Sequence, residues 1–177
     1  MAESKSGGGV TVAEEGNRRR GRMGAEEVTQ CVLDIVSWFK SHTECFENVQ
    51  PGDKSGVQSL SKAIGADVPE ELEEFMLQIN GGAWLYEKKC LSLEESVDKV
   101  LQEGHVTIAS DVDGNYLVAD VESPGTKLYE YDESDGLGSC VASSFSSYIE
   151  EYRNLLLSGK CEFIEDTGIV EEMAGGK

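Results

Sequence analysis

Two closely spaced turn signals constrain the fold of this chain more than any other feature. Asp113-Gly114 and Ser123-Pro124-Gly125 divide a stretch rich in β-branched and aromatic residues into three segments, at 105–109, 115–121 and 126–131. Tight turns of this kind join neighbouring strands as antiparallel hairpins. The sequence therefore predicts an antiparallel sheet near the centre of the chain.

Helical patterns precede these strands. Apolar residues recur at three- and four-residue spacing from Val28 to Phe39, which predicts a helix starting near Ala25. A short helix is expected over 57–64. Pro69 suits the first position of a third helix, because its missing N–H costs nothing there, and Asn80-Gly81-Gly82 is expected to end that helix.

Further elements are expected on both sides of the central strands. Residues 83–86 are strand-like, and Ser92 with Glu95 forms a capping-box pattern before another short helix. Residues 132–138 are predicted to form an acidic loop.

Two elements are expected near the C-terminus. A helix should begin near Ser143 or Ser144, and Cys161–Ile164 is predicted to add an edge strand. The chain thus reads as α+β, with one mostly antiparallel sheet flanked by helices. We expect a disordered basic arm at 1–24, one domain at 25–165 and a flexible acidic tail at 166–177.

Charge narrows the classes of partner. The net charge is −19, and because residues 1–24 carry five basic and three acidic residues, net +2, the remainder carries −21. A nucleic-acid or anionic-membrane binder needs clustered cations, so both classes are disfavoured. The short Arg18–Arg22 run is most simply part of a flexible arm, with a nuclear address or an RNA contact as alternatives.

The five cysteines are odd in number and none are spaced as Cys-x-x-Cys. Together with the lack of an opening signal sequence or a long apolar run, this favours reduced thiols in the cytoplasm, with the nucleus as an alternative. With two histidines in the chain, a zinc cage and other cofactors are not expected.

Three motifs, taken together, resemble the SUKH superfamily, the group around the fungal Smi/Knr cell-wall regulators. They are Ile64–Phe75 followed by Asn80-Gly81-Gly82, then Val106–Tyr116, then Ala142–Ile149, and the resemblance spans about 57–157. It implies a single α+β domain that works by binding proteins, as bacterial immunity proteins and eukaryotic regulators of the superfamily do. It supplies no catalytic residues.

One segment invites a chemical interpretation. Asp111, Asp113, Asn115 and Glu122 occupy positions 1, 3, 5 and 12 of a calcium-loop pattern, but Tyr116 stands where that loop needs glycine. A hairpin turn in which Asp111 and Asn115 bond local N–H groups explains the pattern better. Calcium binding, or a small hydrolase-type enzyme using these acidic residues, is the alternative.

Aromatic residues provide candidates for partner contact. Trp84 and Tyr86 alternate along one predicted strand, and Tyr129 and Tyr131 along another, so neighbouring strands would gather them on one face. Packing beneath the helices is an equally good interpretation. We expect a non-enzymatic module, a monomer or weak homo-oligomer, that presents these aromatics and the acidic turn at Asp111, Asp113 and Asn115 to a protein partner with a basic surface.

Overall fold

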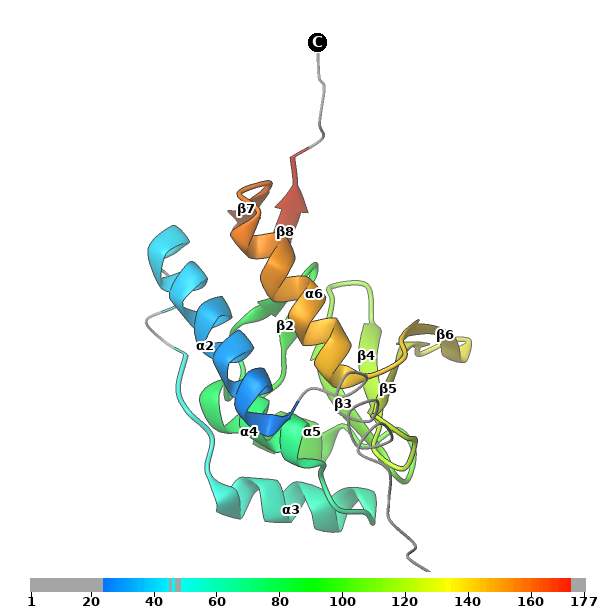
Figure 1. Ribbon diagram of the computed structural model, residues 1–177. Coiled ribbons are helices and arrows are strands. Elements are labelled where there is room, and N and C mark those ends of the chain that lie inside the picture. Colours follow the sequence, from blue (N-terminus) through cyan, green and yellow to red (C-terminus); the bar gives the residue numbers. More distant parts are fainter. Residues whose placement is uncertain (1–23, 45, 47–48, 173–177) are drawn as a thin grey trace, which may run out of the picture.

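The computed structural model describes residues 24–44, 46 and 49–172. The helices are α2 (Ala25–His42), α3 (Lys54–Ile64), α4 (Glu70–Gln78), α5 (Leu93–Asp98) and α6 (Phe145–Leu157). The strands are β1 (Trp84–Leu85), β2 (Lys88–Cys90), β3 (His105–Ser110), β4 (Asn115–Asp120), β5 (Lys127–Asp132), β6 (Gly136–Ala142), β7 (Cys161–Ile164) and β8 (Gly168–Glu171). The predicted α+β class is confirmed (Figure 1). Of the tails predicted at 1–24 and 166–177, residues 1–23 and 173–177 lie outside the described residues.

Strands β1 to β6 form one sheet in sequence order, and every neighbouring pair is antiparallel. Both turn signals act as predicted, joining β3 to β4 and β4 to β5. Gly114 and Gly125 have φ values of 81° and 76°, a region that glycine enters without steric cost. The central meander therefore follows from its turn residues.

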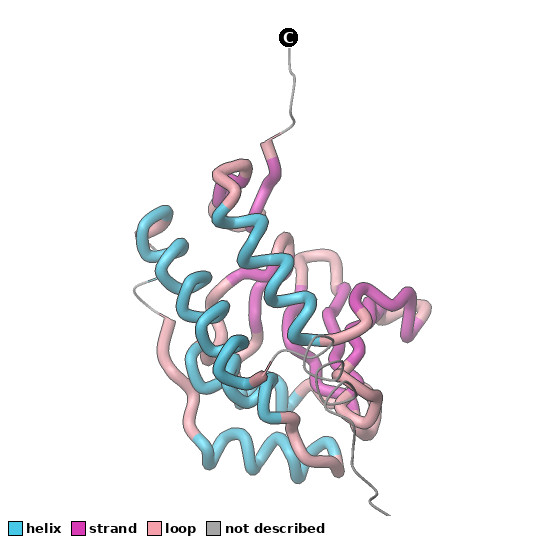
Figure 2. The backbone as a smooth tube through the Cα atoms, in the orientation of Figure 1, coloured by secondary structure: helices cyan, strands magenta, loops and turns pink. Residues whose placement is uncertain are grey.

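The core lies between the sheet and the helices. Leu117, Ala119 and Leu128 alternate with outward-facing neighbours and belong to the apolar cluster that the helices cover. Helices α2 and α6 lie side by side on this inner face (Figure 2). Phe75 of α4 and Phe145 of α6 meet edge to face, with ring centroids 5.6 Å apart. In the described part of the chain no helix is long and apolar enough to span a membrane.

Helix termini follow their capping residues. Ser92 and Glu95 form the predicted capping box of α5. Pro69 is the N-cap of α4 rather than its first helical residue, because its ψ of 149° is extended. Ser144 caps α6, with its hydroxyl accepting from the Ser147 N–H at 3.1 Å.

Replacing the α6 cap gives a first test of this packing. Ser144→Ala removes the acceptor for the Ser147 N–H, so we expect the free energy of unfolding to fall by about 1 kcal/mol in urea titration. Ser144→Thr keeps the oxygen and should retain most of the stability. Equal losses in the two variants would show that the hydroxyl does not cap the helix.

Three strands differ from expectation. Residues 136–138, predicted as part of an acidic loop, begin β6, because pairing with β5 outweighs the loop preference of their two glycines. Residues 168–171, assigned to the flexible tail, instead form β8 and pair with the predicted strand β7. β2 was not predicted. The β7–β8 hairpin lies against the β1 edge, where the Ile169 N–H donates to the Tyr86 carbonyl at 3.0 Å.

Candidate partner-binding groove

The Asp111–Asn115 segment is a hairpin turn that uses its first carboxylate internally. Asp111 Oδ1 accepts the backbone N–H groups of Asp113 at 2.9 Å and Asn115 at 3.0 Å. Burial acts to raise the pKa of Asp111, but these hydrogen bonds and the nearby Lys88 charge outweigh it and lower the pKa. The preferred turn interpretation is confirmed for Asp111. Among the described residues, no group of three or more His, Cys, Asp or Glu side chains could hold a metal ion.

Removing the turn carboxylate should destabilise the fold. Asp111→Ala leaves two N–H groups without their acceptor, so we expect a loss of about 1–2 kcal/mol in urea titration at pH 7. Because the folded pKa is lowered, this contribution is present above the unfolded pKa of about 3.9 and is lost as pH falls through the folded value. Asp113→Ala, at an exposed side chain of the same turn, is the control and should change stability by about 0.5 kcal/mol or less.

The predicted aromatic face does not form. Trp84 lies in β1, whereas Tyr86 lies beyond that strand and packs against Tyr152 of α6, with ring centroids 4.7 Å apart. Tyr129 and Tyr131 lie on β5, and three strands separate β1 from β5 in the sheet. The two pairs therefore belong to different parts of the molecule.

The β5 tyrosines also lie on the other face of the sheet. Tyr131 pairs with Tyr116 and Tyr129 with Val118, so they share a face away from the core residues Leu117 and Ala119. The rings of Tyr116 and Tyr131 lie 6.3 Å apart. This outer face is a separate aromatic layer.

A groove of about 260 Å³ lies between the β1–β2 turn, the inner face of the sheet and α6. Its lining is mixed: an apolar and tyrosine floor, one lysine, and three glutamates. We call it the acidic groove; its residues are Leu85, Tyr86, Glu87, Lys88, Leu117, Glu130, Val141, Tyr148 and Glu151. Of the predicted contact residues, this set includes Tyr86.

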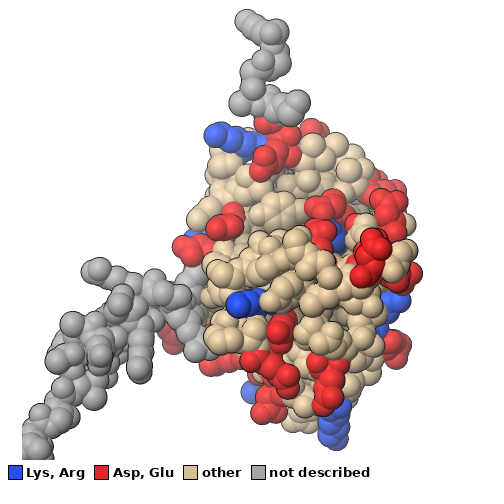
Figure 3. Space-filling model, turned by 90° about the vertical axis from the view of Figure 1, so that its right-hand side faces the viewer, with Lys and Arg blue, Asp and Glu red and all other residues tan. Residues whose placement is uncertain are grey.

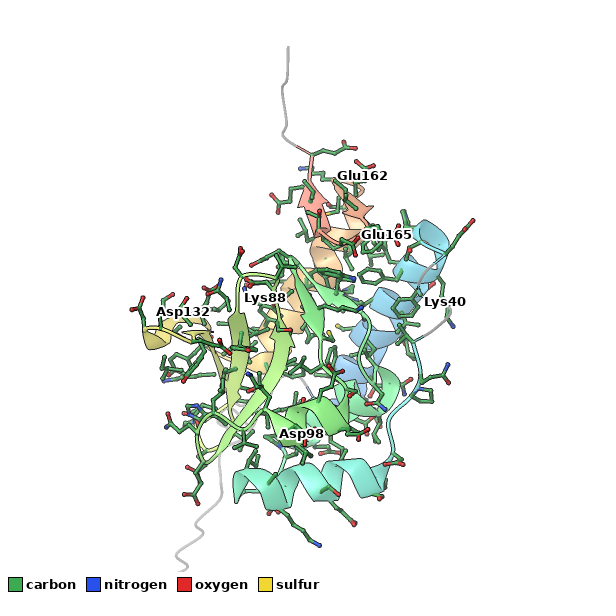
Figure 4. The ribbon with its side chains drawn as sticks, turned by 180° about the vertical axis from the view of Figure 1, so that it is seen from behind. Lys40, Lys88, Asp98, Asp132, Glu162 and Glu165 are labelled. Carbon is green, nitrogen blue, oxygen red and sulfur yellow. The ribbon has the colours of Figure 1, made fainter. Side chains whose placement is uncertain are left out.

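Lys88 is the central charge of this region, and its side chain is 6 % exposed. Its Nζ lies 2.9 Å from Glu87, 3.6 Å from Glu130 and 3.8 Å from Asp111. Burial acts to lower the pKa of Lys88, but the Glu87 hydrogen bond and the three carboxylate charges outweigh it and raise the pKa. Figure 4 shows Lys88 on the sheet and Asp132 at the β5–β6 hairpin.

The groove rim keeps an excess of negative charge. Glu87 and Glu130 are 58 % and 51 % exposed, and Glu151 is exposed on α6. The groove lining therefore carries three carboxylates and one ammonium group. Burial raises the pKa values of Tyr86 and Tyr148, so both phenols are neutral at pH 7. The face of the molecule drawn in Figure 3 carries many more acidic than basic side chains.

Tyr86 has an unusual backbone conformation, with φ at 56°. A bulky residue is strained in this region and stays there only where its surroundings hold it. Here the carbonyl of Tyr86 accepts the Ile169 N–H, and its ring contacts Tyr148 and Tyr152. Backbone strain of this kind concentrates at binding sites, which is consistent with the position of Tyr86 in the acidic groove.

Residues 51–151 match the model of the SMI1/KNR4 family (SUKH-1). The match covers more than half of the 177 residues. The chain belongs to the SMI1/KNR4 family. The SUKH resemblance predicted over about 57–157 is thereby confirmed, and all residues of the acidic groove fall inside the matched SUKH-1 region. No curated protein sequence matches the chain.

Sequence reasoning missed most of the groove of this SUKH-1 domain. Lys88 and Glu130 are ordinary charged residues in the sequence, and burial of a lysine carries no local signal. Val141 was missed because β6 was not predicted. β2 also gave no sequence signal, because its two buried positions are Lys88 and Cys90 and the preceding Tyr86-Glu87 turn contains no glycine or asparagine.

Proposed function

We propose that this SUKH-1 domain is a non-enzymatic protein-interaction module that regulates a basic protein partner in the cytoplasm or nucleus. The acidic groove is the contact site. The observation that carries the proposal is the excess of carboxylates on the groove rim, with the single lysine already paired to three acidic side chains. A charged rim of this kind accelerates association with an oppositely charged surface and selects against acidic competitors.

The groove chemistry favours an arginine or lysine side chain as the inserted group. Glu130 and Glu151 approach the groove from the sheet and from α6, so a cation between them would be attracted from both sides. The neutral rings of Tyr86 and Tyr148 offer contact surface to the aliphatic or guanidinium part of the same side chain.

A charge-reversal experiment tests this proposal. Glu130→Arg/Glu151→Arg reverses the rim, whereas Asp135→Arg/Glu162→Arg makes the same net change, from −19 to −15, at exposed positions outside the groove. Each full-length protein is used to capture partners from the source cell, with amounts compared by mass spectrometry over a range of salt concentrations. Melting temperatures are measured first to establish that both variants fold.

We expect the rim variant to capture at least tenfold less of the partner than the wild-type protein does. The control variant should capture most of the wild-type amount, because two close ion pairs contribute more to binding than diffuse charge does. Rising salt should weaken the wild-type complex. Equal retention by both variants, or a complex insensitive to salt, would contradict the proposal.

A further inference from the structure

The two edges of the six-stranded sheet differ. At the β1 edge, the β7–β8 hairpin lies alongside, and Ile169 bonds the Tyr86 carbonyl. At the other edge, β6 has β5 on one side and, within the described residues, no strand on the other. An open edge presents unpaired N–H and C=O groups that can receive another strand.

The β6 sequence lacks most features that protect natural edges. Residues 136–142 contain no charged residue and no proline, and most of them are exposed. Leu137 and Val141 are 44 % and 42 % exposed. Of the features that protect edge strands, lysine, proline and inward charge are absent from β6, whereas β-bulges are present. The edge is therefore open to strand addition except where the bulges interrupt it.

A bulge connects this edge to the acidic groove. Leu128 pairs with Ala142 and Tyr129 with Cys140, so Val141 is an extra residue on β6 between these pairs. Val141 lines the groove, on the face of the sheet opposite Tyr129. Bulges re-aim side chains in this way beside binding sites. A strand placed along β6 would therefore run past the mouth of the groove.

The net charge of the chain indicates what kind of segment would bind at the β6 edge. A second copy would bring another −19 to the same edge, and like charges disfavour that association. A basic segment would instead be attracted by the groove rim. We propose that β6 receives an extended segment of the basic partner as an added strand, with one arginine or lysine of that segment in the acidic groove. This inference rests on the proposed function and adds the mode of recognition.

Defined peptides test the mode of recognition. The probe is a blocked hexapeptide of alternating threonine and valine with one central arginine, measured by fluorescence anisotropy. Two N-methylated versions carry the methyl groups on alternate residues, one in each frame. A strand uses the N–H groups of one frame only to pair with an edge, so we expect one version to bind at least tenfold more weakly and the other to retain affinity.

Amide hydrogen exchange on the full chain locates the bound peptide. We expect slower exchange in β6 and unchanged exchange in β1, whose edge is already covered. No protection of β6 at peptide concentrations up to about 1 mM would overturn the inference. So would a dimer whose β6 amides are protected without peptide.

Binding measurements in which the charges are changed separate failure of this inference from failure of the proposed function. Replacing the peptide arginine by neutral citrulline, or using Glu130→Arg/Glu151→Arg, should each reduce affinity at least tenfold. If these charge changes reduce affinity but N-methylation in neither frame does, strand addition is wrong and the acidic groove remains the proposed contact site. If neither charge change reduces affinity, the proposed function fails as well.

Discussion

Tyr152→Ala lowers the free energy of unfolding by about 3–5 kcal/mol. Tyr152 is fully buried in α6, and its hydroxyl donates to the Trp84 carbonyl at 2.7 Å. Its ring packs on Tyr86. Truncation therefore creates a cavity, leaves a β1 carbonyl without its donor and disturbs the groove beside Tyr86, which urea titration at pH 7 would measure.

Two controls separate these contributions. Tyr152→Phe keeps the ring and removes the hydroxyl, so we expect a loss of about 1–2 kcal/mol for the unsatisfied Trp84 carbonyl. Leu157→Ala, at an exposed position of the same helix, should cost about 0.5 kcal/mol or less. A Tyr152→Ala loss no larger than that of Leu157→Ala would show that α6 does not pack on β1 as described.

Lys88→Met lowers the free energy of unfolding by about 1–3 kcal/mol, because three carboxylates lose their shared cation while the chain keeps a side chain of similar length. Glu87 and Glu130 reach water and are screened, so the expected loss is smaller than the roughly 3–5 kcal/mol typical of breaking a fully buried ion pair. Lys89→Met, at the exposed neighbouring position, is the matched control and should cost about 0.5 kcal/mol or less.

Alkaline pH provides an independent check on Lys88. Its pKa is raised on folding, so its stabilising contribution is fully present below the unfolded pKa of about 10.4 and is lost as pH rises through the folded value. The stability difference between wild type and Lys88→Met should therefore be constant near neutral pH and shrink above about 10.4. A Lys88→Met protein more stable than wild type at pH 7 would mean that desolvation outweighs the ion pairs.

The fold could be predicted where short-range chemistry determines structure. Asp113-Gly114 and Ser123-Pro124-Gly125 need particular φ values, and Ser92 with Glu95 satisfies local N–H groups, so these elements were predicted correctly. β6 could not be predicted because Gly136 and Gly138 weaken the strand signal. Pairing with β5, a tertiary effect, decides its conformation.

The candidate site was harder to predict because it is assembled from distant residues. Tyr86 adopts a positive φ that turn rules reserve for glycine and asparagine, so the β1–β2 turn gave no signal. Lys88, Glu130 and Glu151 come from β2, β5 and α6, and the sheet and helix alone bring them together. The predicted binding roles of the turn residues Asp111, Asp113 and Asn115 stay predictions. The same holds for the aromatic residues Trp84, Tyr129 and Tyr131.

Site-specific photo-crosslinking tests directly whether the acidic groove contacts a basic protein partner. A benzoylphenylalanine at position 141, on the groove wall, is compared in the source cell with one at position 33, an exposed leucine on α2 outside the groove lining. We expect Val141→benzoylphenylalanine to crosslink a basic protein through an arginine- or lysine-containing segment, and Leu33→benzoylphenylalanine not to do so. Equal crosslinking from both positions, or an acidic protein captured at position 141, would contradict this expectation.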